Sequence, residues 1–338
     1  MSRAVKIDLK PAMTTRMPAT HDYDMHDEDY KIDGLMKPGV VYSFNKSTTD
    51  TWIACTGNHG RYMIDSSACT AKQMTNSAEN LVMKILTRDS VQVLFPFDKT
   101  PAVYVNGIKT GSLKHAIKSI GCSDGYRFKS RFIGSSDTGI YYLSGTNLVY
   151  YTWASLSMLD FKACSILQQD VIDFDLTSNS YVCITTRNTF TKDGVDMSDI
   201  KSKACHRHLT TIGIVGSHAV CSATVTDNSA VIQAYGMNGV FESSVMIQVA
   251  KGPNKGGNEG ICWIMPAGVT HGHAAFIAVE RYRYVHLVAI DSHGKLSVTS
   301  RVEVTKSPYP IMCVSAYDIE GQFIVGGNKW IKKISVKM

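Results

Sequence analysis

The chain has 338 residues, of which 44% are hydrophobic and 19% are charged, and its formal net charge is +6. This length and apolar content allow a sizeable buried core, and no apolar run reaches the roughly 18 residues that a membrane-spanning helix needs. The small basic surplus permits weak contact with acidic surfaces but gives no strong signal for nucleic-acid binding.

The first 38 residues differ in kind from the rest of the chain. Residues 4–9 alternate apolar and polar side chains as a strand does, and no uninterrupted apolar stretch of a secretory signal precedes them. An acidic arm rich in Met and His follows, without the periodicity of a strand, and we interpret it as a solvated segment that docks a partner. Its candidate contact residues are Asp22, Asp24, Asp27, Glu28 and Asp29.

From residue 39 to residue 338 a block of four short strand-like runs recurs about every 45 residues, a spacing typical of a β-propeller. The first runs of the seven blocks begin near Val40, Leu81, Phe128, Val171, His218, Ile261 and Ile311. We therefore predict an all-β, seven-bladed β-propeller, with four antiparallel strands per blade, as a single domain over residues 39–338. The first block has at most three convincing strands, which leaves a count of six blades open.

The third and sixth blocks show the pattern most clearly, because β-branched and aromatic runs alternate there with clusters of Gly, Asn, Asp and Ser. In the third block the runs are residues 128–133, 140–143, 148–153 and 158–164. In the sixth block they are residues 261–265, 274–279, 284–290 and 295–304.

The last block has only three runs before the chain stops. A closed ring would leave the outer edge of that blade unpaired, which native sheets avoid. We predict that an N-terminal strand completes the last blade. The best alternating candidate is residues 4–9, and the run near Val40 is the alternative.

Residues 324–336, which read IVGGNKWIKKISV, place a Gly-Gly-Asn turn before alternating apolar and basic residues. This stretch resembles the third strand of WD40-type β-propellers, and the resemblance implies their fold over most of the chain. No Trp-Asp dipeptide occurs, and the one Gly-His pair, Gly272-His273, therefore has no partner. The buried Asp-His-Ser/Thr-Trp network of that family is accordingly not assigned to residues here.

Two long connections and one basic segment are further candidates for partner contacts. Residues 191–203 project from the fourth block, and residues 251–260 form a Gly-rich connection between the fifth and sixth blocks. Residues 281–284 alternate arginine and tyrosine. The candidate contact residues in these three segments are Lys201, Lys203, Lys251, Lys255, Arg281 and Arg283.

Several short motifs resemble catalytic or metal-binding sites, but each has a simpler structural interpretation. Residues 135–142 partly match the Asp-box of sialidase-type propellers and also read as a hairpin turn. Residues 121–125 match Gly-x-Ser-x-Gly without the helix that a nucleophile elbow needs. The two His-x-His pairs, at residues 206–208 and 271–273, lack further ligands nearby, so we predict no metal, cofactor or catalytic residue.

Asp173 and Asp175 share one face of a predicted strand, where they either face solvent or accept hydrogen bonds from backbone amides. The nine cysteines are mostly scattered through strands without the spacing of a disulfide framework. Buried reduced thiols explain them, which favours a soluble intracellular protein, either cytoplasmic or within an assembly.

The sequence favours a non-catalytic protein–protein interaction scaffold, a subunit of a larger assembly whose partners are other protein subunits. A propeller offers two loop faces and a rim for docking. One alternative is a glycan-binding or sialidase-like propeller, which rests on the partial Asp-box. Another is a viral or other particle-forming structural protein, which no particular residue or motif indicates.

Overall fold

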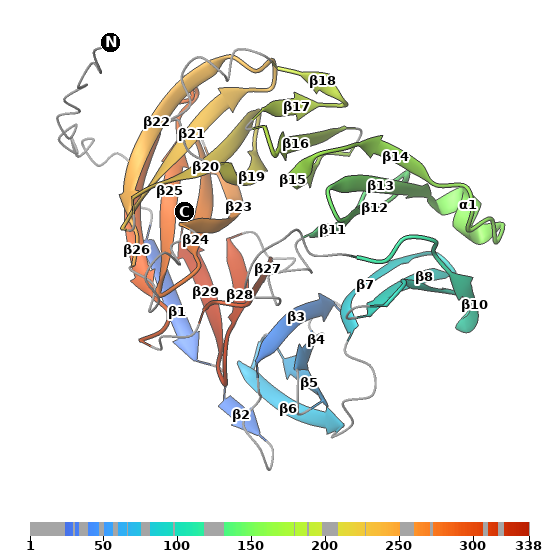
Figure 1. The fold of residues 1–338 in the computed structure, drawn as a ribbon. Helices are drawn as coiled ribbons and strands as arrows, with labels where there is room; N and C mark the ends of the chain where they lie inside the picture. Colours follow the sequence, from blue (N-terminus) through green and yellow to red (C-terminus); the bar gives the residue numbers. More distant parts are fainter. Residues whose placement is uncertain are drawn as a thin grey trace, which may run out of the picture.

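The computed structural model describes residues 24–29, 31–33, 40–46, 51–56, 60–65, 67–75, 82–96, 99–117, 132–178, 180–187, 189–197, 209–226, 228–250, 260–270, 273–306, 310–316 and 321–337. Within them the chain forms seven sheets arranged around a central axis (Figure 1), which confirms the predicted seven-bladed propeller. The described part holds no helix of the length and hydropathy that a membrane crossing requires.

The first three blades occupy the N-terminal half of the ring. Blade one contains β3 (Val41–Lys46), β4 (Thr51–Thr56), β5 (Gly60–Asp65) and β6 (Thr70–Thr75). Blade two contains β7 (Val82–Arg88), β8 (Val91–Pro96), β9 (Ala102–Val105) and β10 (Ile108–Ser112). Blade three contains β11 (Ile133–Ser135), β12 (Gly139–Ser144), β13 (Asn147–Thr152) and β14 (Ser165–Gln168), with α1 (Trp153–Ser157) before its last strand.

The other four blades complete the ring. Blade four contains β15 (Val171–Leu176), β16 (Tyr181–Thr185), β17 (Phe190–Lys192) and β18 (Val195–Asp196). Blade five contains β19 (Leu209–Val215), β20 (His218–Thr226), β21 (Ser229–Gly236) and β22 (Phe241–Gln248). Blade six contains β23 (Ile261–Thr270), β24 (His273–Glu280), β25 (Tyr284–Ile290) and β26 (Leu296–Glu303). Blade seven contains β27 (Cys313–Ala316), β28 (Gln322–Gly326), β29 (Ile331–Lys337) and the N-terminal β1 (Asp24–Asp29).

The first strand of each blade lies innermost, and neighbouring first strands contact one another around the axis. Strand β8 illustrates why these sequences form blades, because its residues alternate between buried and half-buried and so fill the space on one face. Tight turns join the strands: Asn106 and Gly107, at φ 51° and 76°, join β9 to β10. Two consecutive positive φ values are what a two-residue hairpin of this hand requires.

Some strand assignments made from the sequence were wrong. Blade five begins with β19 at Leu209, and His218 begins its second strand instead. Gly213 interrupts the apolar pattern of β19, but a Cβ atom there would lie 2.7 Å from Ile264, so the glycine allows close contact with blade six. In blade three the last strand follows residue 164, because Thr152 caps α1 by accepting a hydrogen bond from the Ser155 amide (3.0 Å).

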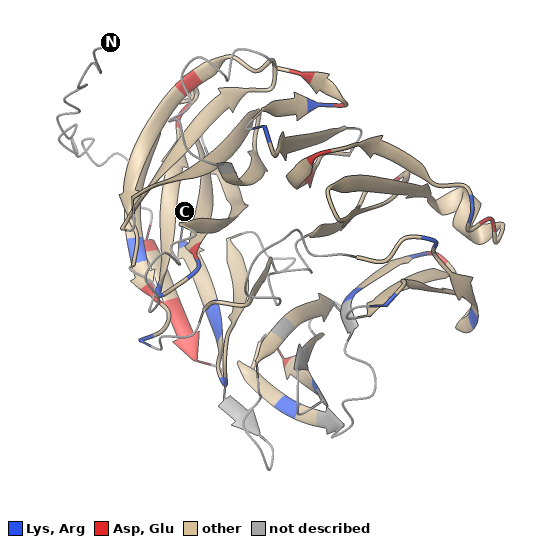
Figure 2. Ribbon diagram, viewed as in Figure 1, with Lys and Arg blue, Asp and Glu red and all other residues tan. Residues whose placement is uncertain are grey.

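The predicted closure by an N-terminal strand is confirmed, but the strand is β1 rather than residues 4–9, which lie outside the described residues. β1 pairs antiparallel with β29, and Figure 2 shows its acidic residues beside the basic strand. Lys332 forms ion pairs with Asp27 and, at 3.5 Å, with Asp29. Charge complementarity between the strands therefore replaces the apolar alternation that we expected of a closing strand.

The segment after β1 also reaches blade one. β2 (Lys31–Asp33) pairs in parallel with β6 and adds a fifth strand to the outer edge of that sheet. The N-terminal segment thus joins the outer strands of blades seven and one. On the inner side, the Val41 amide donates to the Gly327 carbonyl oxygen (3.1 Å) across the same blade boundary.

Side chains on the inner strands join successive blades. Asp173 Oδ2 accepts from the Ile212 amide at 2.8 Å, and Asp175 Oδ2 accepts from the Ile214 amide at 2.7 Å. The interpretation that these carboxylates hold backbone amides is therefore confirmed. Asn45 Oδ1 likewise accepts from the Ile85 amide (2.8 Å), which joins blades one and two.

Lys84 joins blades two and three, since its Nζ donates to the Ile133 carbonyl oxygen at 2.7 Å. Burial lowers the pKa of Lys84 to about 8, and the Asp175 carboxylate opposes this effect only in part. An unfolded lysine has a pKa of about 10.4, so between pH 8 and pH 10 the unfolded chain binds more protons than the folded one. The contribution of this residue to stability therefore rises with pH in that interval.

Lys84→Met is accordingly expected to raise the free energy of unfolding by about 1–2 kcal/mol at pH 7, and this advantage should shrink as the pH approaches 10. Urea unfolding of wild type and variant at pH 7, 8.5 and 10 measures the difference. The exposed Lys109→Met is the matched control and should show no such trend. A constant difference between Lys84→Met and wild type across these pH values would contradict the explanation.

Candidate functional site

The structure describes six of the eleven candidate contact residues. Asp22, Lys201, Lys203, Lys251 and Lys255 lie outside the described residues, so their predicted contacts stay predictions. Asp24, Asp27, Glu28 and Asp29 belong to the closing strand β1. Arg281 and Arg283 lie in the turn between β24 and β25.

The acidic residues of β1 have partners within the chain. Besides the ion pairs to Lys332, Glu28 Oε2 accepts a hydrogen bond from the Cys69 thiol at 3.2 Å. Asp24 accepts from the Met25 amide (2.8 Å) and lies 3.0 Å from His26 Nε2. The acidic segment thus holds the ring closed, and its predicted contact with a partner remains untested.

The turn of blade six gathers arginine and tyrosine side chains. The ring centroid of Tyr284 lies 5.5 Å from the Arg283 guanidinium carbon and 4.8 Å from that of Arg301. Arg283 Nε also donates to Glu303 Oε1 at 2.8 Å. Arg281 is buried, with its guanidinium carbon 5.1 Å from the centroid of Tyr282. We call these six residues the basic–aromatic cluster: Arg281, Tyr282, Arg283, Tyr284, Arg301 and Glu303.

Strand register explains why these residues meet. Tyr284 pairs with Glu303 and His286 pairs with Arg301 between β25 and β26, and alternate residues of a strand share a face. Arg283 has φ 80°, a left-handed conformation that few non-glycine residues adopt. The Val304 amide fixes this turn by donating to the Arg283 carbonyl oxygen at 2.8 Å.

A buried hydrogen bond between His286 and Glu280 lies next to the cluster. His286 Nε2 and Glu280 Oε1 are 2.6 Å apart, and their side chains are 2% and 1% exposed. Burial is the largest effect on Glu280 and raises the pKa of its carboxyl, although His286 opposes this shift. Glu280 Oε2 also accepts from the Ala250 amide at 2.8 Å, which ties the end of blade five to blade six.

This turn also anchors both ends of a predicted contact loop. Ala250 is bound to Glu280, and the Arg281 amide donates to the Gly260 carbonyl oxygen at 3.1 Å. The loop of Lys251 and Lys255 therefore begins and ends at the turn that carries Arg281 and Arg283. No local pattern in the sequence links the two segments, and Arg301 and Glu303 were not among the predicted contact residues.

A cavity of about 240 Å³ lies near the axis, where blades five, six and seven meet, at the end of the blades opposite the cluster. None of the described residues that line it is charged; they are Val215, Gly216, Pro266, Ala267, Gly268, Val269, Ala316, Gly321, Gln322 and Phe323. We expected the first strand of blade six to end at Met265, but β23 continues to Thr270 through a bulge between Pro266 and Gly268. Proline is tolerated in a strand at such a bulge. The described part of the lining suits an apolar side chain.

The residues of the partial Asp-box form the turn between β11 and β12. Ser136 Oγ lies 2.9 Å from Thr138 Oγ1, and the Trp153 indole donates to the Ser136 carbonyl oxygen at 3.0 Å. These contacts account for the motif as a hairpin turn. Across the described ranges, no group of three or more His, Cys, Asp and Glu is placed to hold a metal ion.

Comparisons with known proteins identify the fold. No protein-family model matches the chain, and no curated protein matches its sequence. Among solved structures, a chain of the Mitotic Checkpoint Complex aligns over 100% of this chain and 99% of its own length, with a TM-score of 0.60 and 8% identity.

Two further structures align over most of both chains. The computationally designed Ika8 protein covers 92% of this chain and 100% of its own, with a TM-score of 0.54 and 12% identity. A chain from the S. cerevisiae complex of Dbp5 with Nup159 and Gle1 covers 94% and 96%, with a TM-score of 0.55 and 9% identity. At these identities the similarity concerns the fold alone. The chain is thus a seven-bladed β-propeller, built without Trp-Asp dipeptides.

Proposed function

We propose that the chain is a non-catalytic interaction scaffold, a subunit of a larger assembly, which docks acidic segments of partner proteins at the basic–aromatic cluster. One observation carries this proposal. Two segments that the sequence marked as contact candidates meet at the turn between β24 and β25: the arginines of residues 281–283 and the two ends of the loop that contains Lys251 and Lys255. Arginine and tyrosine are the residue types that dominate binding energy at protein interfaces.

The charges of the cluster favour an acidic partner. Arg283 and Arg301 are the exposed arginines of the cluster; the half-buried Glu303 pairs with Arg283, and the buried Glu280 lies against His286. Arginine side chains that rest on tyrosine rings are held in place before a partner arrives, so little side-chain entropy is lost on binding. No described feature gives the glycan-binding alternative comparable support, since Arg281 and Arg283 lie in the turn between β24 and β25 and Arg301 lies in β26, the last strand of that blade.

The test compares native protein with purified recombinant protein by size-exclusion chromatography with light scattering, and identifies partners by mass spectrometry. We expect a native complex that is lost in the double variant Arg283→Glu/Arg301→Glu. The double variant Lys109→Glu/Lys162→Glu changes the net charge equally at exposed sites on blades two and three and should keep the complex. A monomer in native material would contradict the proposal, as would a complex that survives both double variants.

A further inference from the structure

We propose that Arg283 and Arg301 form a binding site for a phosphate monoester carried by a side chain of a partner protein. This inference rests on the proposed function and specifies the chemistry that the partner presents. It begins from the fact that two guanidinium groups from different segments of blade six lie over one tyrosine ring, that of Tyr284.

The contact with the ring does not use the hydrogen-bond donors of either guanidinium group. A guanidinium above an aromatic face is attracted by the ring, while its N–H groups stay in its own plane and point outward. Arg283 uses its Nε for Glu303, and its side chain is 46% exposed. Arg301 is exposed, and within the described ranges no carboxylate lies at ion-pair distance from it. Both side chains therefore offer donors to a ligand from solvent.

A phosphate monoester fits this pair better than a carboxylate does. A phosphorylated side chain carries about −1.5 to −2 charges at pH 7 and three acceptor oxygens, enough for two arginine forks at once. A carboxylate has one charge and two oxygens, and Glu303 already supplies one to Arg283. A second carboxylate would therefore bind mainly the guanidinium group of Arg301. A phosphate dianion can bind the guanidinium groups of both arginines and compete with Glu303 for Arg283.

The backbone of the turn is held in an unusual conformation. The φ of Arg283 is 80°, where glycine would be the unstrained residue. Hydrogen bonds on both sides keep the turn in place: Val304 N donates to the Arg283 oxygen at 2.8 Å, and Ile311 N donates to the Arg281 oxygen at 2.7 Å. A bulky residue in such a conformation is a recognised sign of a functional constraint. Here the constraint places the Arg283 guanidinium over Tyr284.

The experiment titrates the full chain with the capped peptide Gly-Gly-phosphoserine-Gly-Gly and with the same peptide carrying serine or aspartate. Isothermal titration calorimetry gives affinities, and the arginine Nε–Hε signals in NMR spectra report on the side chains. We expect shifts of the Arg283 and Arg301 signals and at least tenfold tighter binding of the phosphopeptide than of the aspartate peptide. Arg301→Gln should weaken this binding at least tenfold, and Arg187→Gln, at an exposed arginine of blade four, should leave it unchanged.

Arg283→Gly separates binding from folding, because glycine adopts the positive φ freely. We expect it to weaken phosphopeptide binding at least tenfold with an unchanged or higher Tm. The inference would be overturned if the serine peptide bound as tightly as the phosphopeptide. It would also be overturned if Arg301→Gln and Arg283→Gly both bound the phosphopeptide as tightly as wild type. Inorganic phosphate or vesicles of phosphatidylinositol phosphate that bind while the phosphopeptide does not would also overturn it, in favour of a free anion or a lipid.

The same material distinguishes the two proposals. If the native complex persists after phosphatase treatment of the extract and phosphopeptide does not bind, the phosphate site is wrong and the scaffold function stands. If native material contains no complex, the scaffold function is wrong whatever the peptide titration shows.

Discussion

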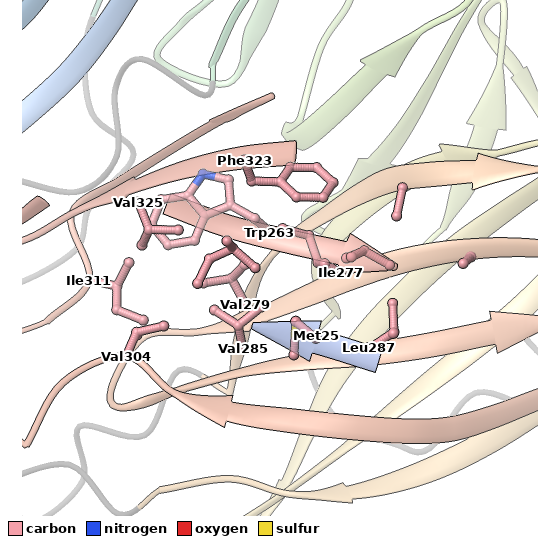
Figure 3. Close-up of a cluster of buried hydrophobic side chains, with 14 of the residues drawn as sticks. Met25, Trp263, Ile277, Val279, Val285, Leu287, Val304, Ile311, Phe323 and Val325 are labelled. Atoms are coloured by element: carbon pink, nitrogen blue, oxygen red, sulfur yellow. The ribbon is translucent and has the colours of Figure 1, made fainter. Parts of the chain in front are cut away.

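Met25→Asp is expected to open the propeller and to lower the free energy of unfolding by about 4 kcal/mol, because it places an unpaired charge in a core. Met25 is the one buried residue of β1, at 4% exposure. It packs in the cluster that joins blades six and seven, where Figure 3 shows it beside Val285 and Leu287. The other side chains of β1 are exposed, so this residue supplies the apolar contact of the closing strand.

Without β1 the outer edge of β29 loses its partner strand. Six residues of each strand pair in register, from Asp24 with Lys337 to Asp29 with Lys332. The ion pairs of Lys332 with Asp27 and Asp29 lie near the surface and contribute about 0–1 kcal/mol each, so they do not hold the strand once the apolar anchor is lost. An unpaired edge of this length is also a site for aggregation.

Circular dichroism during thermal unfolding, combined with light scattering, measures both effects. Met25→Asp should lower the Tm and promote association, while His26→Asp, at the next and exposed position of β1, should change the Tm little. A synthetic peptide of residues 20–33 added in trans should restore the Tm of a chain that begins at residue 34. Equal Tm values for wild type and Met25→Asp would show that β1 does not close the ring.

The sequence predicted the blades well and the closing strand poorly, for physical reasons that particular residues show. Blade strands are short runs of β-branched and aromatic residues bounded by turn residues, and that pattern is local. The suitability of β1 depends on Lys332 and Lys333, about 300 residues away, which compensate for its carboxylates. The extension of β23 was missed because Pro266 signals the end of a strand unless a bulge accommodates it.

The candidate site shows the same limit. Arg281 and Arg283 were identified from their own segment, but Arg301 meets them only through the register of β25 with β26. A single residue shift in that register would place Arg301 on the opposite face of the blade. The bond between Ala250 and Glu280, which brings the lysine-bearing loop to the same turn, links two blades and leaves no local pattern in the sequence.

The second large effect is expected at Asp173, where Asp173→Ala should lower the free energy of unfolding by about 3 kcal/mol. Asp173 is 1% exposed, and its Oδ2 accepts from Thr211 Oγ1 (3.1 Å) and from the Ile212 amide (2.8 Å). The variant leaves both donors of blade five buried without their acceptor, and each such group costs about 1–3 kcal/mol. Asp173→Asn keeps one acceptor oxygen without its charge, so we expect about half the loss.

Asp175 is the matched control, because it lies two residues along the same strand and holds the Ile214 amide in the same way (2.7 Å). It is only half-buried, so water can replace its oxygen, and Asp175→Ala should cost about 1 kcal/mol. Chemical denaturation measures the stabilities, and hydrogen exchange at the Ile212 amide reports on the boundary between blades four and five. If both variants cost the same, burial does not decide the strength of these contacts. If Asp173→Ala costs more and speeds exchange at Ile212, the inner carboxylates hold adjacent blades together because their donors have no access to water.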